Sequence, residues 1–237
     1  MYLKKKILAI IPARGGSKGI KLKNLKKINN LTLIEHVKKN CLDKLGNLID
    51  CSIVSTDNYK ILKHSKSIGL DAPFLRSKKL SGDLVDINLV IADALIKAEK
   101  IFKKNFDIII LIEPTCPLRN FINIKKMIKK LIKSTLHGVW IISKIDNKFN
   151  PLKQLQLKNN KITFFSKNGA KIFARQQLGQ TYIRNGEGYA IKKKFFLKKK
   201  NIYSKKIGYI LSNEPAISID TMSDLKYCEK LLKKNDR

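Results

Sequence analysis

Acidic residues and histidines are scarce in this chain. Its 237 residues include 18 aspartates and glutamates and 3 histidines, against 50 lysines and arginines, and the formal net charge is +32. The histidines stand apart without metal-ligand spacing, so we assign them no chemistry. A charge this high is typical of nucleic-acid-binding proteins, whose affinity comes largely from phosphate contacts. The lysines are nevertheless spread over almost every expected helix and loop, which indicates a compositional bias, and we expect no nucleic-acid partner.

Cysteine pairs and long apolar runs are also missing. The four cysteines, Cys41, Cys51, Cys116 and Cys228, form no C-x-x-C motif, which is typical of reduced thiols in a cytosolic protein. No run of eighteen apolar residues is present, and the first residues lead directly into an expected strand rather than into a cleavable leader. We therefore expect a cytoplasmic location and no membrane partner. The length fits one α/β domain, residues 1–237.

Two familiar phosphate loops are absent, although a basic, glycine-rich loop follows the first apolar run. No Ser or Thr follows Lys18, as a P-loop requires, and the Gly15-Gly16 pair breaks the Gly-x-Gly-x-x-Gly dinucleotide pattern. Residues 7–11 form a continuous apolar run, typical of a strand buried on both faces, and Pro12 ends it.

The loop after this run has the composition of an anion-binding nest. Glycines allow positive φ angles and let backbone N–H groups converge on a ligand. The loop has three of them: Gly15, Gly16 and Gly19. Four cations surround them: Arg14, Lys18, Lys21 and Lys23. We interpret the loop as a polyphosphate site rather than a plain turn, because four like charges would otherwise repel one another.

Arginine is used sparingly and in particular places. The chain has six arginines, and five of them lie in the motifs described here: Arg14, Arg76, Arg119, Arg175 and Arg184. The planar guanidinium binds phosphate or carboxylate with two parallel hydrogen bonds. In a lysine-rich chain this distribution indicates one anion-binding site.

Apolar periodicity predicts alternating strands and helices. We expect strands over residues 49–55, 106–112, 138–143 and 207–211, the last at a sheet edge. We expect helices over residues 31–44, 58–68, 87–102 and 122–133, and a last helix whose apolar stripe, Leu225 to Leu232, packs on the sheet. A hairpin around Asn159-Asn160 is expected within an excursion, residues 148–187, that is too small to fold alone.

Two aspartates each keep two interpretations. Asp57 ends a Val-Ser-Thr-Asp stretch where a parallel strand meets the ligand crevice, but it would also serve as the N-cap of the helix that starts near Asn58. Asp83 either belongs to the loop of residues 74–83 or begins the helix at Ile87.

Six motifs in order resemble those of one enzyme family. The first reads Ile-Pro-Ala-Arg-Gly-Gly-Ser-Lys-Gly and continues to Lys23-Asn24. The six are residues 11–24, 54–57, 74–83, 113–119, 174–189 and 217–225. Together they resemble the acylneuraminate cytidylyltransferases, the CMP-sialic acid synthetases. The resemblance implies a nucleotide-diphospho-sugar-transferase-like (Rossmann-like) α/β fold, with a mainly parallel sheet between helices and the nucleotide at the carboxyl ends of the strands.

The resemblance also implies roles for individual residues. It implies a nucleotide-binding set of Ala13, Arg14, Gly15, Gly16, Ser17, Lys23, Asn24, Arg76 and Ser81. It implies a catalytic set of Arg14, Lys18, Lys23 and Asp220, with Asp220 as the ligand of Mg²⁺. It implies a sugar-binding set of Glu113, Thr115, Arg119, Arg175, Gln176, Arg184, Asn185 and Tyr189.

By the same resemblance the substrates are CTP and a keto sugar acid. The expected reaction transfers CMP to the anomeric hydroxyl of a sialic-acid-like nonulosonate, of the N-acylneuraminate, legionaminate or pseudaminate type, and releases pyrophosphate. The excursion implies a homodimer, because in this family the equivalent segment reaches over the second subunit and supplies residues to its active site. Alternatives are a 3-deoxy-manno-octulosonate cytidylyltransferase, a nucleotide- or sugar-binding homologue without turnover, and a basic RNA-binding protein.

Several positions depart from the family pattern. Glu113 and Cys116 stand where the family usually has Gln and Ser, and Glu187 stands where alanine is common. Ser218 replaces the first of two aspartates, so that only Asp220 matches the metal pair. We interpret Cys116 as a small packing residue, since no histidine stands beside it. These departures leave open which sugar acid is used and how strongly the metal is held.

Overall fold

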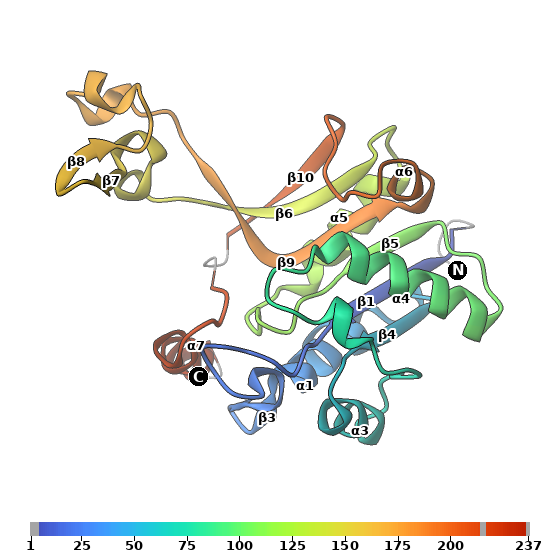
Figure 1. Cartoon of the computed structure of the whole chain (residues 1–237). Helices are drawn as coiled ribbons and strands as arrows, with labels where there is room; N and C mark the ends of the chain where they lie inside the picture. Colours follow the sequence, from blue (N-terminus) through green and yellow to red (C-terminus); the bar gives the residue numbers. More distant parts are fainter. Residues whose placement is uncertain (1–4, 214–216, 236–237) are drawn as a thin grey trace.

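A six-stranded sheet forms the centre of the computed structural model, which describes residues 5–213 and 217–235 (Figure 1). In spatial order the strands are β10 (Ile207–Ser212), β6 (Gly138–Lys144), β9 (Tyr182–Lys192), β5 (Ile108–Leu111), β1 (Ile7–Pro12) and β4 (Cys51–Ser55). β1 is parallel to β4 and β5, and β6 is parallel to β10, whereas β9 runs antiparallel to both of its neighbours. The expectation of a mainly parallel α/β sheet is confirmed.

The first strand lies inside the sheet because both of its faces are apolar. Successive side chains of a strand point to opposite faces. Ile7, Ala9 and Ile11 join one core cluster, Leu8 and Ile10 join the other, and all five are fully buried. A continuous apolar run therefore needs helices on both sides of the sheet.

Helices cover both faces of the sheet (Figure 1). One face is covered by α1 (Leu33–Val37), α3 (Tyr59–Ser67) and α5 (Phe121–Ile132). The other face is covered by α4 (Ile87–Phe102) and α6 (Lys193–Lys199). The sheet is thus the middle of three layers, and its strand ends remain open to a ligand.

The helix expected over residues 31–44 is present but is not uniform. α1 begins with a capping box between Thr32 and Glu35 and continues through a π-helical turn, η2 (Lys38–Leu42), into α2 (Asp43–Leu45). Gly46 ends it at φ 49°, a left-handed value that glycine adopts without steric cost. A short 3-10 turn, η3 (Gly46–Leu48), leads into β4.

The sequence predicts that the last helix packs on the sheet, but α7 (Met222–Asn235) packs elsewhere. Its Leu225 and Cys228 pack with Ile20 and Ile28, beside the glycine-rich loop and the small hairpin of β2 (Lys27–Ile28) and β3 (Leu31–Thr32). The apolar stripe was identified correctly, but its partner is a separate, smaller core. This packing brings the segment before α7 against the glycine-rich loop.

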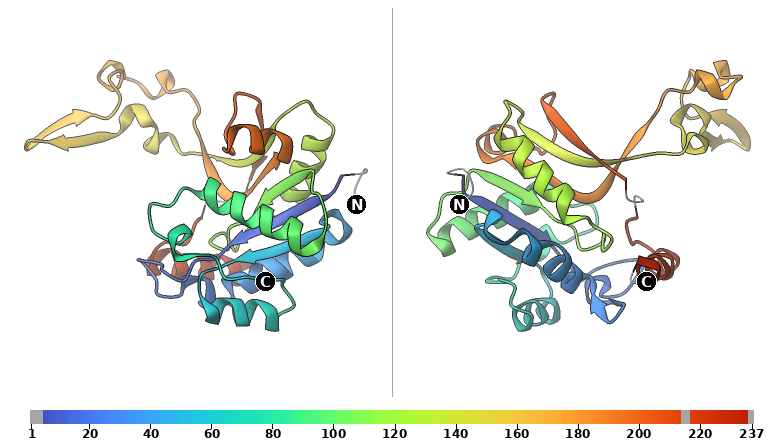
Figure 2. Two further views of the ribbon diagram at one scale, coloured as in Figure 1. Left: turned by 45° about the vertical axis from the view of Figure 1, so that its right-hand side comes forward. Right: turned by 180° about the vertical axis from the view of Figure 1, so that it is seen from behind.

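The excursion forms an arm that projects from the body between β6 and β9 (Figures 1 and 2). The arm spans residues 145–181 rather than the expected 148–187, because residues 182–187 belong to β9 of the central sheet. The expected hairpin is confirmed: β7 (Leu155–Lys158) pairs with β8 (Lys161–Phe164) across Asn159 and Asn160, whose φ angles are 49° and 58°. Every residue of the two strands is exposed. The chain rejoins the sheet at Tyr182. Four 3-10 turns complete the arm: η5 (Asn147–Phe149), η6 (Pro151–Lys153), η7 (Gly169–Lys171) and η8 (Arg175–Gln177).

None of the helices within residues 5–213 and 217–235 has the length and apolar character needed to cross a membrane.

Candidate active site

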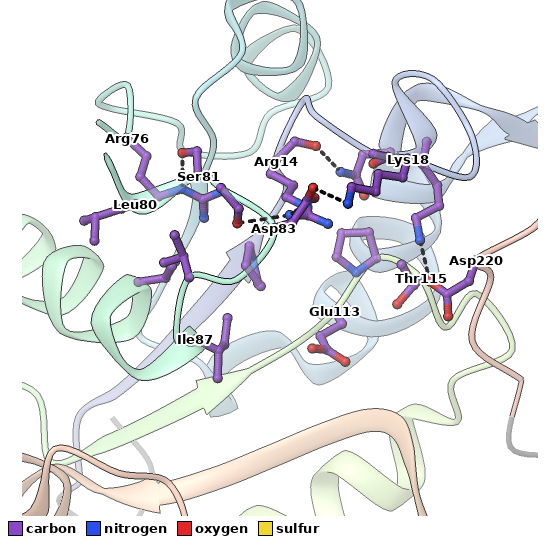
Figure 3. A pocket seen from close by; sticks show the side chains of 18 of the residues that line it. Arg14, Lys18, Arg76, Leu80, Ser81, Asp83, Ile87, Glu113, Thr115 and Asp220 are labelled. Atoms are coloured by element: carbon purple, nitrogen blue, oxygen red, sulfur yellow. Dashed lines mark hydrogen bonds and ion pairs between the residues drawn. The ribbon is translucent and has the colours of Figure 1, made fainter. Parts of the chain in front are cut away.

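A cleft of about 440 Å³ opens at the carboxyl ends of β1 and β5 (Figure 3). This is the edge at which open α/β sheets bind ligands. The predicted site residues that line it are Arg14, Ser17, Lys18, Lys23, Asn24, Arg76, Ser81, Glu113, Thr115 and Asp220. The predicted residues outside its lining are Ala13, Gly15, Gly16, Arg119, Arg175, Gln176, Arg184, Asn185 and Tyr189. The predicted residues that line the cleft come from four of the six motifs, residues 11–24, 74–83, 113–119 and 217–225, which the fold gathers at one place.

The carboxylate of Asp57 holds the glycine-rich loop in place, and the glycines of the loop do not have positive φ angles. The expectation that Gly15, Gly16 and Gly19 adopt positive φ is wrong, since none of them is among the described glycines with positive φ. The backbone N–H of Gly15 instead donates to Oδ1 of Asp57 at 2.8 Å. Asn58, not Asp57, caps α3, so the structure decides between the two interpretations of Asp57.

Gly19 is required for close approach of the segment before α7. A Cβ atom at Gly19 would lie 2.1 Å from the backbone oxygen of Asp220, a distance that no side chain tolerates. A Cβ atom at Gly16 would meet nothing within 4 Å. Gly19 therefore allows a close contact that any side chain would block, whereas the position of Gly16 has room for a side chain.

Lys23 joins the loop to the same segment. Its ammonium donates to the backbone oxygen of Ile219 at 2.6 Å and to Oδ1 of Asp220 at 2.8 Å. The side chain of Lys23 is 13% exposed, whereas that of Asp220 is 73% exposed. Asp220 therefore presents a carboxylate to the open cleft while a nearly buried lysine fixes one of its oxygens. Asp224 accepts from the backbone N–H groups of Asp220 and Thr221 and so fixes the start of α7.

Arg14 and Lys18 share one carboxylate that the sequence did not identify as a site residue. Nη1 of Arg14 lies 2.9 Å from Oδ1 of Asp83, and Nζ of Lys18 lies 2.9 Å from Oδ2 (Figure 3). Arg14 also donates to the backbone oxygen of Gly82 at 3.1 Å. Asp83 does not begin α4, because Asp86 is the N-cap of that helix. The alternative in which Asp83 serves as a cap is wrong.

Arg76 forms the opposite wall of the cleft. It is 5% exposed, and burial lowers its pKa. Its Nε donates to Oγ of Ser81 at 3.1 Å, and Ser81 in turn donates to the backbone oxygen of Ser77. The wall is thus a fixed hydrogen-bonding surface beside the cations of the loop.

Glu113 is a further carboxylate in the lining of the cleft, in addition to Asp83 and Asp220. Burial raises the pKa of Glu113, and the guanidinium of Arg119 opposes that rise. The negative charge of Asp220 adds to it. Cys116, three residues on, is buried as expected of a packing residue, and burial raises the pKa of its thiol to about 12.

Arg119 is buried behind the cleft. Its guanidinium donates to the backbone oxygens of Glu113, Gly186 and Glu187. These bonds tie the loop after β5 to β9. The structure shows the guanidinium of Arg119 hydrogen-bonded to three backbone carbonyl groups. A part for Arg119 in binding the sugar remains a prediction.

Glu187 and Asn185 lie in a buried polar network that the sequence did not suggest. Oε1 of Glu187 accepts from Asn185 at 2.7 Å, and Oε2 accepts from Asn123 at 3.0 Å. Asn185 also donates to Ser143, and Asn123 to Ser212. Since Glu187 is 1% exposed and outside the lining of the cleft, its carboxylate contacts α5 rather than a ligand.

Tyr189 and Arg184 meet at an aromatic cluster beyond Glu113. The ring of Tyr189 packs edge-on against Trp140, with centroids 5.6 Å apart, and the guanidinium of Arg184 lies 5.7 Å from the centre of a Trp140 ring. Tyr203 packs against the same tryptophan. Burial raises the pKa of Tyr189 to about 12, and the nearby carboxylate of Glu113 contributes.

Arg175 and Gln176 lie on the arm, in η8, and both are exposed. Arg175 lines a hollow of about 270 Å³ at the base of the arm, together with Lys144, Asp146 and Gln180. The arm stands away from the body in both views of Figure 2. Within one chain these two residues are not brought to the cleft.

A family model described as cytidylyltransferase matches residues 8–236. The chain belongs to the cytidylyltransferase family. This cytidylyltransferase is 31% identical to post-translational flagellin modification protein B of Campylobacter coli, over 97% of this chain and 96% of that protein. It is 30% identical to CMP-N,N'-diacetyllegionaminic acid synthase of Campylobacter jejuni, over 95% and 94% of the two chains. Its fold matches that of CMP:2-keto-3-deoxy-manno-octonic acid synthetase complexed with CTP, with a TM-score of 0.67 at 14% identity, over 97% of this chain and 99% of that one.

Membership of the family explains why the cleft is basic. The cytidylyltransferase is a nucleotidyltransferase, and such enzymes act on a nucleotide with several negative charges. Lys18, Lys23 and Arg14 come from one loop, and Arg76 comes from another, so that the positive charges surround a single cavity. The family match supports the expected nucleotidyltransferase rather than the alternative of a basic RNA-binding protein.

Proposed function

We propose that this cytidylyltransferase transfers CMP from CTP to the anomeric hydroxyl of a sialic-acid-like nonulosonate, of the N-acylneuraminate, legionaminate or pseudaminate type. The observation that supports this most strongly is the single cleft that combines the cations of the glycine-rich loop with the exposed carboxylate of Asp220. The relative that is named as a legionaminic acid synthase supports a nine-carbon keto acid as the acceptor.

The proposed reaction is an in-line displacement at phosphorus. The anomeric oxygen forms a bond to the α-phosphorus, the bond from that phosphorus to the oxygen of the β-phosphate breaks, and the hydroxyl proton passes to water. Arg14, Lys18 and Lys23 neutralise the charge that develops on the departing pyrophosphate. Arg76 and Ser81 hold the nucleotide at the opposite wall, where their hydrogen-bonding groups are already fixed.

Mg²⁺ is the expected cofactor, and the carboxylates of the cleft fit it. No cluster of three or more His, Cys, Asp or Glu residues suited to a metal occurs in the part of the chain that the structure describes. Mg²⁺ needs no such cluster, because it is commonly held by one or two carboxylates and the phosphates of the substrate. Asp220 would hold it, with Glu113 at the same cleft. When bound, the ion supplies charge neutralisation at the phosphates.

The arm supports a homodimer. Its hairpin exposes apolar side chains that a monomer would leave in water, among them Leu157 at 81% and Ile162 at 67%. Arg175 and Gln176 lie on this arm, away from the cleft of their own chain. In the proposed dimer they reach the cleft of the partner and bind the carboxylate of the sugar acid. We also propose that the enzyme acts in the cytoplasm.

Pyrophosphate release tests this function. The purified enzyme would be supplied with Mg²⁺, each of four nucleoside triphosphates, and a panel of keto sugar acids that includes N-acylneuraminate, legionaminate, pseudaminate and 3-deoxy-manno-octulosonate. We expect release only with CTP and a nine-carbon acid. Release with the eight-carbon acid alone would establish the other cytidylyltransferase activity, and binding of CTP with no release for any acid would indicate a protein without turnover.

A further inference from the structure

The cations of the glycine-rich loop are already paired within the protein, and this contact requires an explanation. Asp83 accepts from Arg14 and Lys18 with one oxygen each, both at 2.9 Å. A carboxylate that bridges two cations stands where an oxygen pair of a phosphate group would stand. A polyphosphate that reaches the same two cations would place its own charge beside that of Asp83. At about 4 Å two like charges repel by about 1 kcal/mol in water and by more near a protein surface, so a bound polyphosphate favours departure of the Asp83 carboxylate.

Asp83 belongs to a short segment, residues 82–85, that is secured mainly by this contact; we call it the strap. It follows the 3-10 turn η4 (Lys78–Leu80) and precedes the N-cap of α4, Asp86. Within the strap the backbone N–H of Val85 donates to the oxygen of Gly82 at 3.4 Å, a long hydrogen bond. Arg14 contacts the strap twice, at Gly82 and at Asp83.

Both ends of the strap are anchored, whereas its middle is not packed. Arg76 and Ser81 fix the preceding residue, and Asp86 accepts from the backbone of Asn88 at the start of α4. Leu84 lies between these anchors with its side chain 100% exposed. The side chain of Leu84 buries no apolar surface here, so it adds no hydrophobic stabilisation to this position. The strap can therefore move without breaking apolar contacts of Leu84.

We infer that Asp83 is an internal competitor for the polyphosphate, and that the strap closes over the glycine-rich loop when the loop is empty and leaves it when a polyphosphate binds. The inference rests on the proposed function only in taking a polyphosphate as the ligand of this loop. A pyrophosphate group carries more charge than one carboxylate and can replace it at the two cations. Asp83 therefore lowers the affinity of the loop for an anion that must displace it, and prevents the two cations from facing one another without a counter-ion.

The ionisation of Asp83 agrees with this role. A hydrogen bond from Lys18 lowers the pKa of Asp83, and the charge of Arg14 acts in the same direction. The carboxylate is thus charged at neutral pH and competes as an anion.

Calorimetric titration with inorganic pyrophosphate, first without and then with Mg²⁺, tests the inference. Exposed ion pairs contribute little each, so we expect Asp83→Asn to lower the Kd for pyrophosphate by about three- to tenfold. Inorganic phosphate, which must displace the same carboxylate from Arg14 and Lys18, should gain by a similar factor. Glu229→Gln is the matched control: it removes one negative charge from an ion pair with Lys233, and Glu229 is as exposed as Asp83, at 37%. The control should leave both affinities unchanged.

A second measurement follows the strap itself. Leu84→Trp places an indole on the strap, and its emission should change when pyrophosphate is added. In the double variant with Asp83→Asn the emission should already resemble the bound form before any ligand is present. The chain has one native tryptophan, so the parent protein titrated in parallel gives the background.

Each other outcome is decisive. If Asp83→Asn binds pyrophosphate equally or more weakly while remaining folded, Asp83 positions the cations or binds Mg²⁺, and the competitor role is wrong. If it loses only the Mg²⁺-dependent part of the affinity, Asp83 is a metal ligand. If pyrophosphate binds to neither protein, the loop is not a polyphosphate site and the proposed function fails with the inference.

Discussion

Lys23 is nearly buried, and its ammonium faces both the cleft and Asp220. Replacing it with alanine removes a fixed positive charge from the place where the leaving group becomes more negative. We expect Lys23→Ala to lower kcat by about a hundred- to a thousandfold, or about 3–4 kcal/mol of transition-state stabilisation. Steady-state pyrophosphate release measures this. Lys21→Ala is the control, since Lys21 is exposed and outside the lining of the cleft. A Lys23→Ala enzyme within about threefold of the parent kcat would refute the role.

Glu113 gives the protein a pH-dependent stability. Burial raises its pKa above the ordinary value of 4.5, so the folded state binds the proton more tightly than the unfolded state does. The stability that this group contributes is fully present below the unfolded pKa and is lost as the pH rises through the folded pKa. We expect Glu113→Gln to be more stable than the parent at pH 8, with a smaller difference at pH 4. Urea unfolding of both proteins at the two pH values measures the difference, and a gain that is the same at both would contradict the assignment.

At the scale of single residues the sequence located the three cations and Asp220, the partner of Lys23, but it missed the carboxylate that Arg14 and Lys18 share. Arg14, Lys18 and Lys23 were predicted from their place in a glycine-rich loop, and all three line the cleft. Asp57 and Asp83 were ambiguous, because an aspartate a few residues before a helix is usually a good N-cap. In each case a neighbour, Asn58 or Asp86, takes the cap, and the aspartate is left to bind the loop. Only the tertiary structure shows which of two neighbouring polar residues caps each helix: Asn58 rather than Asp57, and Asp86 rather than Asp83.

The contact between the glycine-rich loop and the segment before α7 is the tightest between two elements of the site. A methyl group at Gly19 would collide with the backbone oxygen of Asp220, so Gly19→Ala must push that segment away. We expect a loss of about 1–3 kcal/mol in the free energy of unfolding, the usual range for overpacking, together with a large loss of activity as Asp220 is displaced. Chemical denaturation and pyrophosphate release measure the two effects.

Gly16→Ala is the matched control for stability. It adds the same methyl group to the same loop, where nothing lies within 4 Å. Its free energy of unfolding should differ from that of the parent by less than about 0.5 kcal/mol. Equal destabilisation by both substitutions would mean that the loop, rather than its contact with Asp220, is the sensitive feature.

Among the regular elements, the sequence predicted those whose apolar patterns are simple. β1 and β5 are short apolar runs, and the stripe of α4 is continuous, so their positions were predicted within a few residues. β9 was missed, although it lies in the middle of the sheet. Its sequence contains Asn185-Gly186-Glu187-Gly188, residues that are depleted in strands.

Tertiary contacts explain why β9 nevertheless forms. Gly186 has φ 77° in an irregular stretch of the β6–β9 pairing, where the register shifts between Trp140 and Ile142. A Cβ atom at Gly188 would lie 2.6 Å from the side chain of Ile124 on α5, so glycine allows that helix to approach. Glu187 is satisfied by Asn123 on the same helix. These compensations come from parts of the chain far away in sequence, and no local pattern reveals them.

At the scale of the whole molecule the arm is the part that projects from the body, and the sequence located its hairpin from the turn residues Asn159 and Asn160. The family resemblance implied that this segment serves the site of a partner, and the structure shows the arm standing away from the cleft of its own chain (Figures 1 and 2). This separation divides the predicted site into two sets. Lys23 and Asp220 lie in the body, and Arg175 and Gln176 lie on the arm. If both sets are needed at one site, they must come from different chains.

Complementation between two inactive variants tests that division. Lys23→Ala inactivates the body of a chain, and Arg175→Ala inactivates its arm. In a mixed dimer with two-fold symmetry, one site combines both defects, and the other combines the intact body of one chain with the intact arm of its partner. After the two variants are unfolded together and refolded at equal amounts, about a quarter of all sites should therefore be functional, against almost none in either variant alone. Lys23→Ala mixed with Lys21→Ala Lys23→Ala is the control and should stay inactive. Failure of the first mixture to regain activity, with dimers present by light scattering, would place Arg175 outside the partner's site.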